Sequence, residues 1–249
     1  METNAPFVGV DGCPDGWVAV RYGSDSFVDA RRYGSIEALW EDNRDAETIL
    51  VDVPVGVADD AAAREPEREA RAVLGPRSSS VFNVPIRPVL GVEDYHDANE
   101  EQKDRIDTGL QRQTHAIAPR IRAVDDLLRD DDVGATQDVL REAHPEVCFW
   151  AFAGETPMAY SKTGQPAAAF WERVEVLEPV DEEFVTHLRA AGNAVRDWAD
   201  PELSNDDLLD AFVLALTARE GAGDYRTLPA EPATDAAGLR MEMVFAHPG

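Results

Sequence analysis

In the first 60 positions, short apolar runs are separated by clusters of turn-forming residues, a pattern that predicts strands before the first helix. Residues 7–11 form a short apolar run that ends in an acid, and residues 12–16 are dense in turn formers. Residues 17–21 predict the return strand of a hairpin, and residues 26–33 predict a further strand after a second turn. This order predicts an antiparallel meander.

The next segments extend the meander into a mixed sheet. Ser35 is an N-cap residue before a predicted helix, and residues 48–53 form the continuous apolar run of a strand buried on both faces. Because β-α-β crossovers are right-handed, the helix would lead to a strand parallel to the first one. The pattern therefore predicts an α/β fold.

Helical patterns dominate the rest of the chain. Residues 139–150 contain a strand-like run, but Pro145 interrupts it, which fits an edge strand or a bulge. Ser204 caps a predicted amphipathic helix that runs to about residue 220. Residues 221–249 are rich in Pro, Gly and Ala and are expected to be loosely ordered. The other helical stretches are residues 59–80, 97–130 and 181–199.

No internal repeat, low-complexity run or Gly/Ser linker divides the 249 residues. We therefore expect a single domain over residues 1–220. A helical insertion would occupy about residues 59–135, and residues 221–249 would form a C-terminal extension.

The charge of the chain is strongly negative, with 49 Asp and Glu against 23 Lys and Arg and a net charge of -26. Lysine occurs only at Lys103 and Lys162, and the acids are dispersed along the chain. Salt at ~1 M shortens the Debye length to ~3 Å and removes most of the self-repulsion. This composition predicts a protein of a halophilic organism; the alternative is an acidic protein with a regulatory role. Binding of nucleic acid or anionic membranes through bulk charge is excluded.

The sequence also predicts where the protein works. No apolar stretch approaches the ~18 residues of a membrane-spanning helix, and residues 1–6 have no basic signal-peptide segment. Cys13 and Cys148 are too few for a zinc site or a disulfide framework. We expect a cytoplasmic protein that does not bind membranes.

Two acids come directly after apolar runs that predict buried strands, so they are not explained as solvated surface residues. Asp11 ends the first apolar run, and Asp52 follows the buried run and precedes Pro54. Ligands of open α/β sheets bind beyond the carboxyl ends of strands, and a buried carboxylate costs several kcal/mol unless it is paired, protonated or metal-bound. If the two strands are parallel neighbours, both acids point into one crevice. For Asp11 the alternative is an Asx-turn residue that opens the hairpin.

Further acids lie on later segments. Asp206 and Asp207 fall in the first turn of the last predicted helix, where a capping box and the helix dipole explain them. Asp210 lies one turn further, at the edge of the apolar stripe, and would face the sheet or the rim of a site. Glu142 and His144 would share one strand face, with His144 either a general base or a group bound to an interior carbonyl.

Acids from separate segments that converge at one end of a sheet describe a divalent-metal site. Asp11, Asp52 and Asp210 would hold Mg²⁺ or Mn²⁺, and Glu142 or Asp207 would complete the shell. Two such ions ~4 Å apart activate water and stabilise the leaving oxygen in phosphodiester cleavage.

The densest basic stretch lies between residues 64 and 87. Arginine suits bidentate phosphate contacts, whereas pairing with glutamates of the same helix explains only part of this stretch. Lys162 stands in a Gly-bounded loop that suggests a contact with phosphate or carboxylate. The predicted phosphate ligands are Arg71, Arg77, Arg87 and Lys162.

Five short segments in this order resemble domain-of-unknown-function family 429, whose members are regarded as predicted nucleases with a ribonuclease H-like fold. The segments are residues 8–18, 51–56, 71–82, 142–146 and 206–211. The resemblance spans about residues 7–220. It implies a mixed five-stranded sheet of order 3-2-1-4-5 flanked by helices. Where the family shows Cys-Asp, this chain has Pro66-Glu67, so the carboxylate is kept but longer.

The resemblance also implies roles for the acids. Asp11 would be the first-strand acid, Asp52 the fourth-strand acid, and Asp207 and Asp210 the final-helix pair, as in RuvC-type resolvases. Glu142 would correspond to the next-strand acid of related families. We expect a metal-dependent nuclease or phosphodiesterase that acts on nucleic acid or another phosphodiester. The alternatives are a non-catalytic binding or regulatory protein on the same fold and, as a third reading, a phosphotransferase of the actin-like or sugar-kinase type.

Overall fold

The structure is a computed structural model that describes residues 5–60, 64–196 and 203–249. The strands of the main sheet are β1 (Phe7–Cys13), β2 (Gly16–Tyr22), β3 (Phe27–Tyr33), β4 (Thr48–Val51) and β5 (Leu140–Glu142), and a separate pair comprises β6 (Arg226–Leu228) and β7 (Met243–Phe245). The helices are α1 (Ile36–Asp42), α2 (Glu65–Leu74), α3 (Tyr95–Ile106), α4 (Arg112–Arg129), α5 (Pro145–Phe152), α6 (Pro166–Leu177), α7 (Phe184–Val195) and α8 (Asn205–Glu220), with 3-10 helices η1 (Gly75–Ser80) and η2 (Arg87–Val89).

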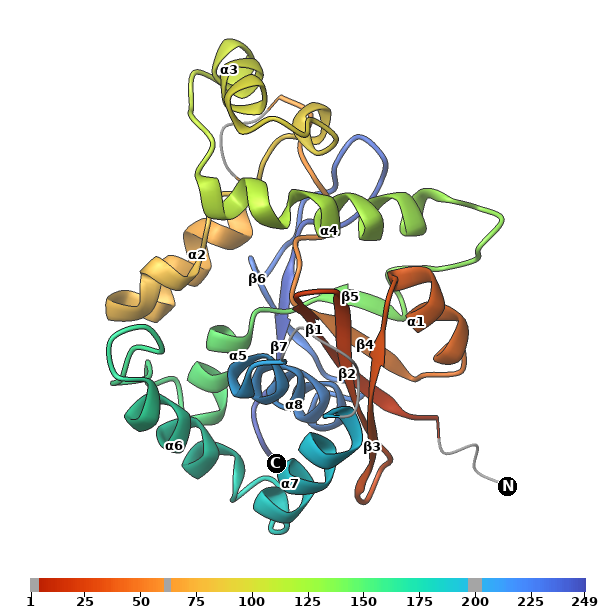
Figure 1. The fold of residues 1–249 in the computed structure, drawn as a ribbon, viewed down its shortest axis with the longest axis vertical. Coiled ribbons are helices and arrows are strands. Elements are labelled where there is room, and N and C mark those ends of the chain that lie inside the picture. The colour runs from red at the N-terminus through yellow and green to blue at the C-terminus, as the bar shows by residue number, and fades with distance from the viewer. Residues whose placement is uncertain (1–4, 61–63, 197–202) are drawn as a thin grey trace.

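The main sheet has the order β3-β2-β1-β4-β5, which confirms the predicted α/β fold and strand order. β1 pairs antiparallel with β2 and parallel with β4, and β5 pairs parallel with β4. One apolar cluster joins one face of the sheet to α5–α8, and a second joins the other face to α1 and α4. In Figure 1, α4 lies above the sheet and α5–α8 form a group in the lower part of the view.

Helix α8 packs directly on β1 because Gly9 has no side chain. A Cβ at Gly9 would lie 2.1 Å from both Ala211 O and Ala215 N. The pattern predicts an amphipathic helix here, but every residue of α8 from Leu208 to Ala218 is buried. The physical reason is that the sheet covers one side of α8 while α5, α6 and α7 cover the other.

The segment 139–150 differs from the strand-like run that the sequence predicts. It forms the short strand β5 followed by helix α5, with His144 at the N-cap and Pro145 at the first helical position. Proline is favoured there because its missing N–H has no partner in a first helical turn. Helix α6 has no counterpart among the predicted elements.

The C-terminal residues form a packed hairpin, in contrast to the loose order that their composition predicts. Strands β6 and β7 pair antiparallel, and Leu228, Met243 and Phe245 are buried against α2 and α5. The ring of Phe245 meets Trp150 edge-on at 5.6 Å between centroids. A few apolar residues are therefore enough to anchor a segment rich in Pro and Gly.

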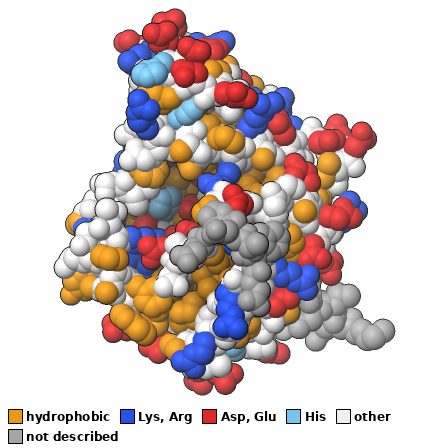
Figure 2. Space-filling model, viewed as in Figure 1, with side chains coloured by type: hydrophobic (Ala, Val, Ile, Leu, Met, Phe, Trp, Pro, Cys, Tyr) orange, Lys and Arg blue, Asp and Glu red, His pale blue; other side chains and the backbone are white. Residues whose placement is uncertain are grey.

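The surface carries the dispersed charge that the sequence indicates. Figure 2 shows acidic side chains over several separate regions of the visible face, with Lys and Arg between them. Within the described ranges, the structure has no helix long and apolar enough to cross a membrane.

Candidate active site

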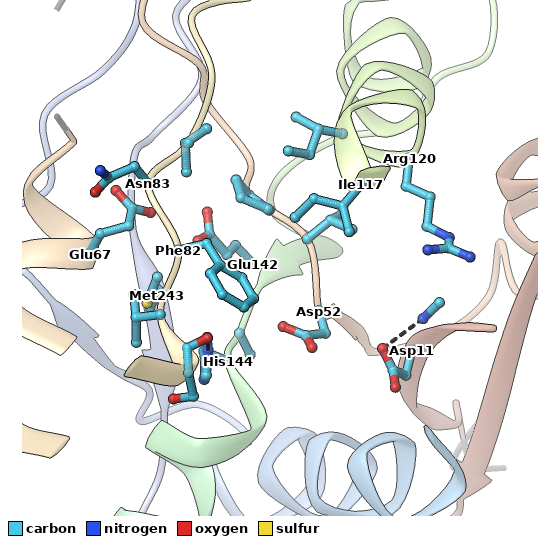
Figure 3. Close-up of a pocket in the computed structure, with 18 of the residues that line it drawn as sticks. Asp11, Asp52, Glu67, Phe82, Asn83, Ile117, Arg120, Glu142, His144 and Met243 are labelled. Carbon is cyan, nitrogen blue, oxygen red and sulfur yellow. Dashed lines mark hydrogen bonds between the residues drawn. The ribbon is translucent and has the colours of Figure 1, made fainter. Parts of the chain in front are cut away.

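Asp11 and Asp52 lie side by side where the parallel ladder between β1 and β4 ends. The ladder pairs Val10 with Val51, and the Asp52 N–H donates to Val10 O at 3.0 Å. The two acids follow these paired valines and line the same cavity (Figure 3). The structure thus brings together the two strand acids that the sequence singles out.

Asp11 does not open the hairpin. Strand β1 continues to Cys13, and Asp11 stands opposite Val18 within the β1–β2 ladder. Its Oδ1 accepts a hydrogen bond from the Gly12 N–H at 2.7 Å. Because Gly12 and Cys13 still pair with β2, the turn falls at residues 14–15, and Asp11 faces the cavity from inside a strand.

The acids at this edge raise one another's pKa. Burial, followed by the charges of Asp52, Asp210 and Asp207, raises the pKa of Asp11 well above its usual value. Burial likewise raises the pKa of Asp52 to about 6, although His144 acts in the opposite direction. The site therefore holds negative charge that the surrounding protein compensates only in part.

Asp210 comes to this edge from α8 and is paired with Lys162. The ammonium Nζ donates to Oδ1 at 2.6 Å and to Oδ2 at 2.5 Å. Burial would lower the pKa of Lys162, but the charge of Asp210 and its hydrogen bonds to the ammonium together raise the pKa above its usual value. Lys162, a predicted phosphate ligand, thus binds a carboxylate, which was the other contact that its loop suggests.

Asp207 has a structural task as well as a place in the cavity. It completes a capping box with Ser204: its N–H donates to Ser204 Oγ at 3.0 Å, and its Oδ2 accepts from the Ser204 N–H at 3.2 Å. The predicted capping box is therefore present. Burial raises the pKa of Asp207.

Glu142 also lines the cavity, but protein groups bind its carboxylate. Oε2 accepts from the Val55 N–H at 2.7 Å and from Arg64 Nη2 at 2.6 Å. Burial raises the pKa of Glu142 to about 8. These bonds tie the end of β5 to the loop after β4.

His144 is bound at both ring nitrogens. Nδ1 accepts the Glu146 N–H at 3.2 Å as the N-cap of α5, and Nε2 lies 3.4 Å from Ser80 O. Because Nδ1 is an acceptor, this network assigns the ring proton to Nε2. The interior-carbonyl contact is the one that the structure contains.

The three predicted arginine ligands of phosphate are not among the residues that line this cavity. Arg71 donates to Val81 O at 3.1 Å and to Asn83 Oδ1 at 2.7 Å. Arg87 pairs with Asp125 and Asp235, and Arg77 lies on η1. Arg71 therefore stabilises the cavity wall at residues 81–83, and Arg87 links η2 to α4 and to the C-terminal residues.

Arg120 of α4 is the one Lys or Arg among the described residues that line the cavity. Its Nη2 donates to Cys13 O at 2.5 Å. A Cβ at Gly12 would lie 2.8 Å from Arg120 Nε, so the glycine makes room for the guanidinium beside Asp11. No sequence motif marks Arg120 as a site residue, although its position on a helical face with the apolar Ile117 and Ile121 is a signal that it turns inward.

The donor set fits a divalent cation through two carboxylates rather than three. Across the described ranges, no group of three His, Cys, Asp or Glu is arranged to hold a metal ion. Lys162 neutralises Asp210 and leaves Asp11 and Asp52. Mg²⁺ is commonly bound by one or two carboxylates and several waters, and a cation between these acids would offset the charge of Asp52, which raises the pKa of Asp11.

The fold and this site define an α/β protein with an acid-lined cavity at the carboxyl edge of a mixed sheet. The chain matches, over residues 9–234, the family described as Protein of unknown function (DUF429), and it belongs to that family. The match confirms the family resemblance of the short motifs. No curated protein and no solved structure matches the chain.

Proposed function

We propose that the protein is a divalent-metal-dependent phosphodiester hydrolase, a nuclease, on a ribonuclease H-like fold. The observation that carries the proposal is the pair Asp11 and Asp52, which follow directly after the last paired residues of the parallel β1–β4 ladder. The strand order and the packing of α8 on β1 support the same fold assignment.

The residues divide the work as follows. Asp11 and Asp52 bind the cation, and Lys162 binds both carboxylate oxygens of Asp210 beside them. Arg120 faces the same end of the cavity and binds a non-bridging phosphate oxygen. Bound Mg²⁺ or Mn²⁺ would supply the positive charge that acidifies a water and stabilises the leaving oxygen.

The net charge of -26 limits how the substrate reaches this site. Long-range attraction of nucleic acid is absent, so binding depends on contacts within the cavity. At ~1 M salt the Debye length is ~3 Å, and only groups in direct contact with the substrate matter. The assays therefore belong in concentrated KCl.

The test is cleavage of bis(4-nitrophenyl) phosphate and of a short labelled oligonucleotide with and without Mn²⁺. Asp11→Asn and Asp52→Asn should each lower metal-dependent cleavage by about 100-fold or more, because each removes a metal ligand. Asp126→Asn, an exposed acid of α4, is the matched control and should leave the rate unchanged. Full activity of Asp11→Asn would refute the assignment.

A specific observation favours a second candidate, a non-catalytic binding or regulatory protein. Lys162 pairs with Asp210, one of the three acids that the sequence predicts as metal ligands. This candidate predicts no heat of Mn²⁺ binding in calorimetry at high KCl. A saturable heat that Asp52→Asn removes would reject it.

A further inference from the structure

The end of the cavity away from Asp11 and Asp52 contains a carboxylate without a hydrogen-bond partner. Glu67 is 2% exposed, and neither Oε1 nor Oε2 accepts a hydrogen bond within the described chain. Its ion-pair contact is Arg64 Nη2 at 3.4 Å, but that nitrogen donates to Glu142. A buried acceptor without a donor is costly, so this carboxylate is suited to a ligand that brings N–H groups.

A hydrogen-bond donor lies on the same side of the cavity. Asn83 Oδ1 accepts from Arg71 Nη2 at 2.7 Å, which fixes the amide and directs Nδ2 away from the arginine. Figure 3 shows Glu67 and Asn83 on one side of the cavity and Asp11 and Asp52 on the other, with Phe82 between them. This side thus offers two acceptor oxygens and one donor group.

The walls between the two ends suit a flat ring. Phe82 is a large apolar side chain that stays 38% exposed at the cavity, and Ile117 and Val84 also line it. The cavity volume is about 250 Å³, below the ~300–1,000 Å³ of typical ligand pockets. Such a space admits a single base and excludes a duplex.

We propose that the cavity binds a single guanine nucleotide. The N1–H and 2-amino groups of guanine donate to Glu67, O6 accepts from Asn83 Nδ2, and the ring stacks on Phe82. The phosphate then lies toward Arg120 and the strand acids, a placement that rests on the proposed function. Adenine and cytosine each place a ring acceptor against the Glu67 carboxylate and are disfavoured.

The test is calorimetry of the full chain in concentrated KCl without divalent metal, with 5′-GMP, 5′-IMP and 5′-AMP as probes. GMP should bind at least about 100-fold more tightly than AMP, because a site built for N–H donors rejects a base that lacks them. IMP, which lacks the 2-amino group, should bind about tenfold more weakly than GMP. Equal affinities for GMP and AMP, or binding of methylguanidine without GMP, would overturn the proposal.

Variants separate recognition from folding. Glu67→Gln should weaken GMP at least tenfold and reduce the preference over AMP, whereas Glu65→Gln, on the outer face of α2, should change neither. Phe82→Ala removes an exposed ring and should weaken GMP and AMP by the same factor of about tenfold. If Glu67→Gln does not fold, an unchanged GMP affinity of Phe82→Ala decides against the site.

The outcome is independent of catalysis. Binding in Asp52→Asn, which removes a proposed metal ligand, should retain the GMP preference. GMP selectivity without cleavage in the wild type would reject the hydrolase and keep the guanine site. Cleavage without GMP selectivity would reject the guanine site alone.

Discussion

At the scale of single residues, the site contains carboxylates whose burial in the ionised form lowers the free energy of unfolding. Burial raises the pKa of Asp52 to about 6. A carboxyl whose pKa is higher in the folded state than in the unfolded state binds protons more tightly when folded. The protein therefore loses stability as the pH rises from about 4 through about 6.

Asp52→Asn removes this loss. Above pH 7 we expect the variant to be more stable than the wild type by about 2 kcal/mol, and below pH 4 the difference should disappear. Urea unfolding at fixed KCl over this pH range measures it. A variant that is less stable than the wild type at pH 7.5 would show that the Asp52 charge is well compensated.

Lys162 offers a second prediction at this scale. Lys162→Met leaves Asp210 buried without its cation and should lower the free energy of unfolding by about 3 kcal/mol. Because the charge of Lys162 lowers the pKa of Asp11 and Asp52, the variant should also bind Mn²⁺ about tenfold more tightly above pH 7.

Thermal unfolding with and without Mn²⁺ measures both effects. Mn²⁺ should stabilise Lys162→Met more than the wild type, and the exposed Lys103→Met should behave as the wild type. An identical response of all three proteins would place Lys162 outside the influence of the metal.

At the scale of elements, the contact between α8 and β1 positions the acids of the last helix. Gly9→Ala places a Cβ 2.1 Å from backbone atoms of α8, which must move away. We expect a loss of about 3 kcal/mol in stability and weaker Mn²⁺ binding. Gly34→Ala, where a Cβ meets no atom within 4 Å, is the matched control and should be nearly neutral. If Gly9→Ala leaves the stability unchanged, the close packing of α8 on β1 is contradicted.

Much of the architecture was predictable at this scale because buried strands leave a clear signal. The apolar run before Asp52 and the turn residues around Pro14 predict β1, β2 and β4. The hydrophobic pattern did not predict the features that depend on tertiary contacts, namely the full burial of α8 and the ordered C-terminal strands. The cover on the outer side of α8 and the apolar anchors of β6 and β7 come from segments far away in sequence.

The candidate site residues also differ in whether local pattern or tertiary contacts place them. Asp11 and Asp52 were predictable because strand register alone places them together. The partners of Asp210 and Glu142 were not, because Lys162 and Arg64 reach them from loops or helices whose orientation no periodicity fixes. Glu67, Asn83 and Arg120 share a cavity for the same non-local reason.

At the scale of the whole molecule, the charge of -26 governs stability more than chemistry. Acidic side chains are spread over the visible surface (Figure 2), so their mutual repulsion is distributed and sensitive to salt. We propose that the protein is adapted to concentrated salt. The melting temperature should rise steeply with KCl up to ~1 M or more and much less with a non-ionic osmolyte at equal osmolality. A melting temperature indifferent to KCl would contradict this.

The central claim is that Asp11 and Asp52 share a divalent cation. The most direct measurement is a crystal structure of the protein grown in KCl with Mn²⁺, with anomalous data collected at the manganese edge. The account predicts a peak about 2.1 Å from carboxylate oxygens of both residues, and its loss in Asp52→Asn. A map with no peak between these two acids, or with manganese bound only at surface carboxylates, would contradict it.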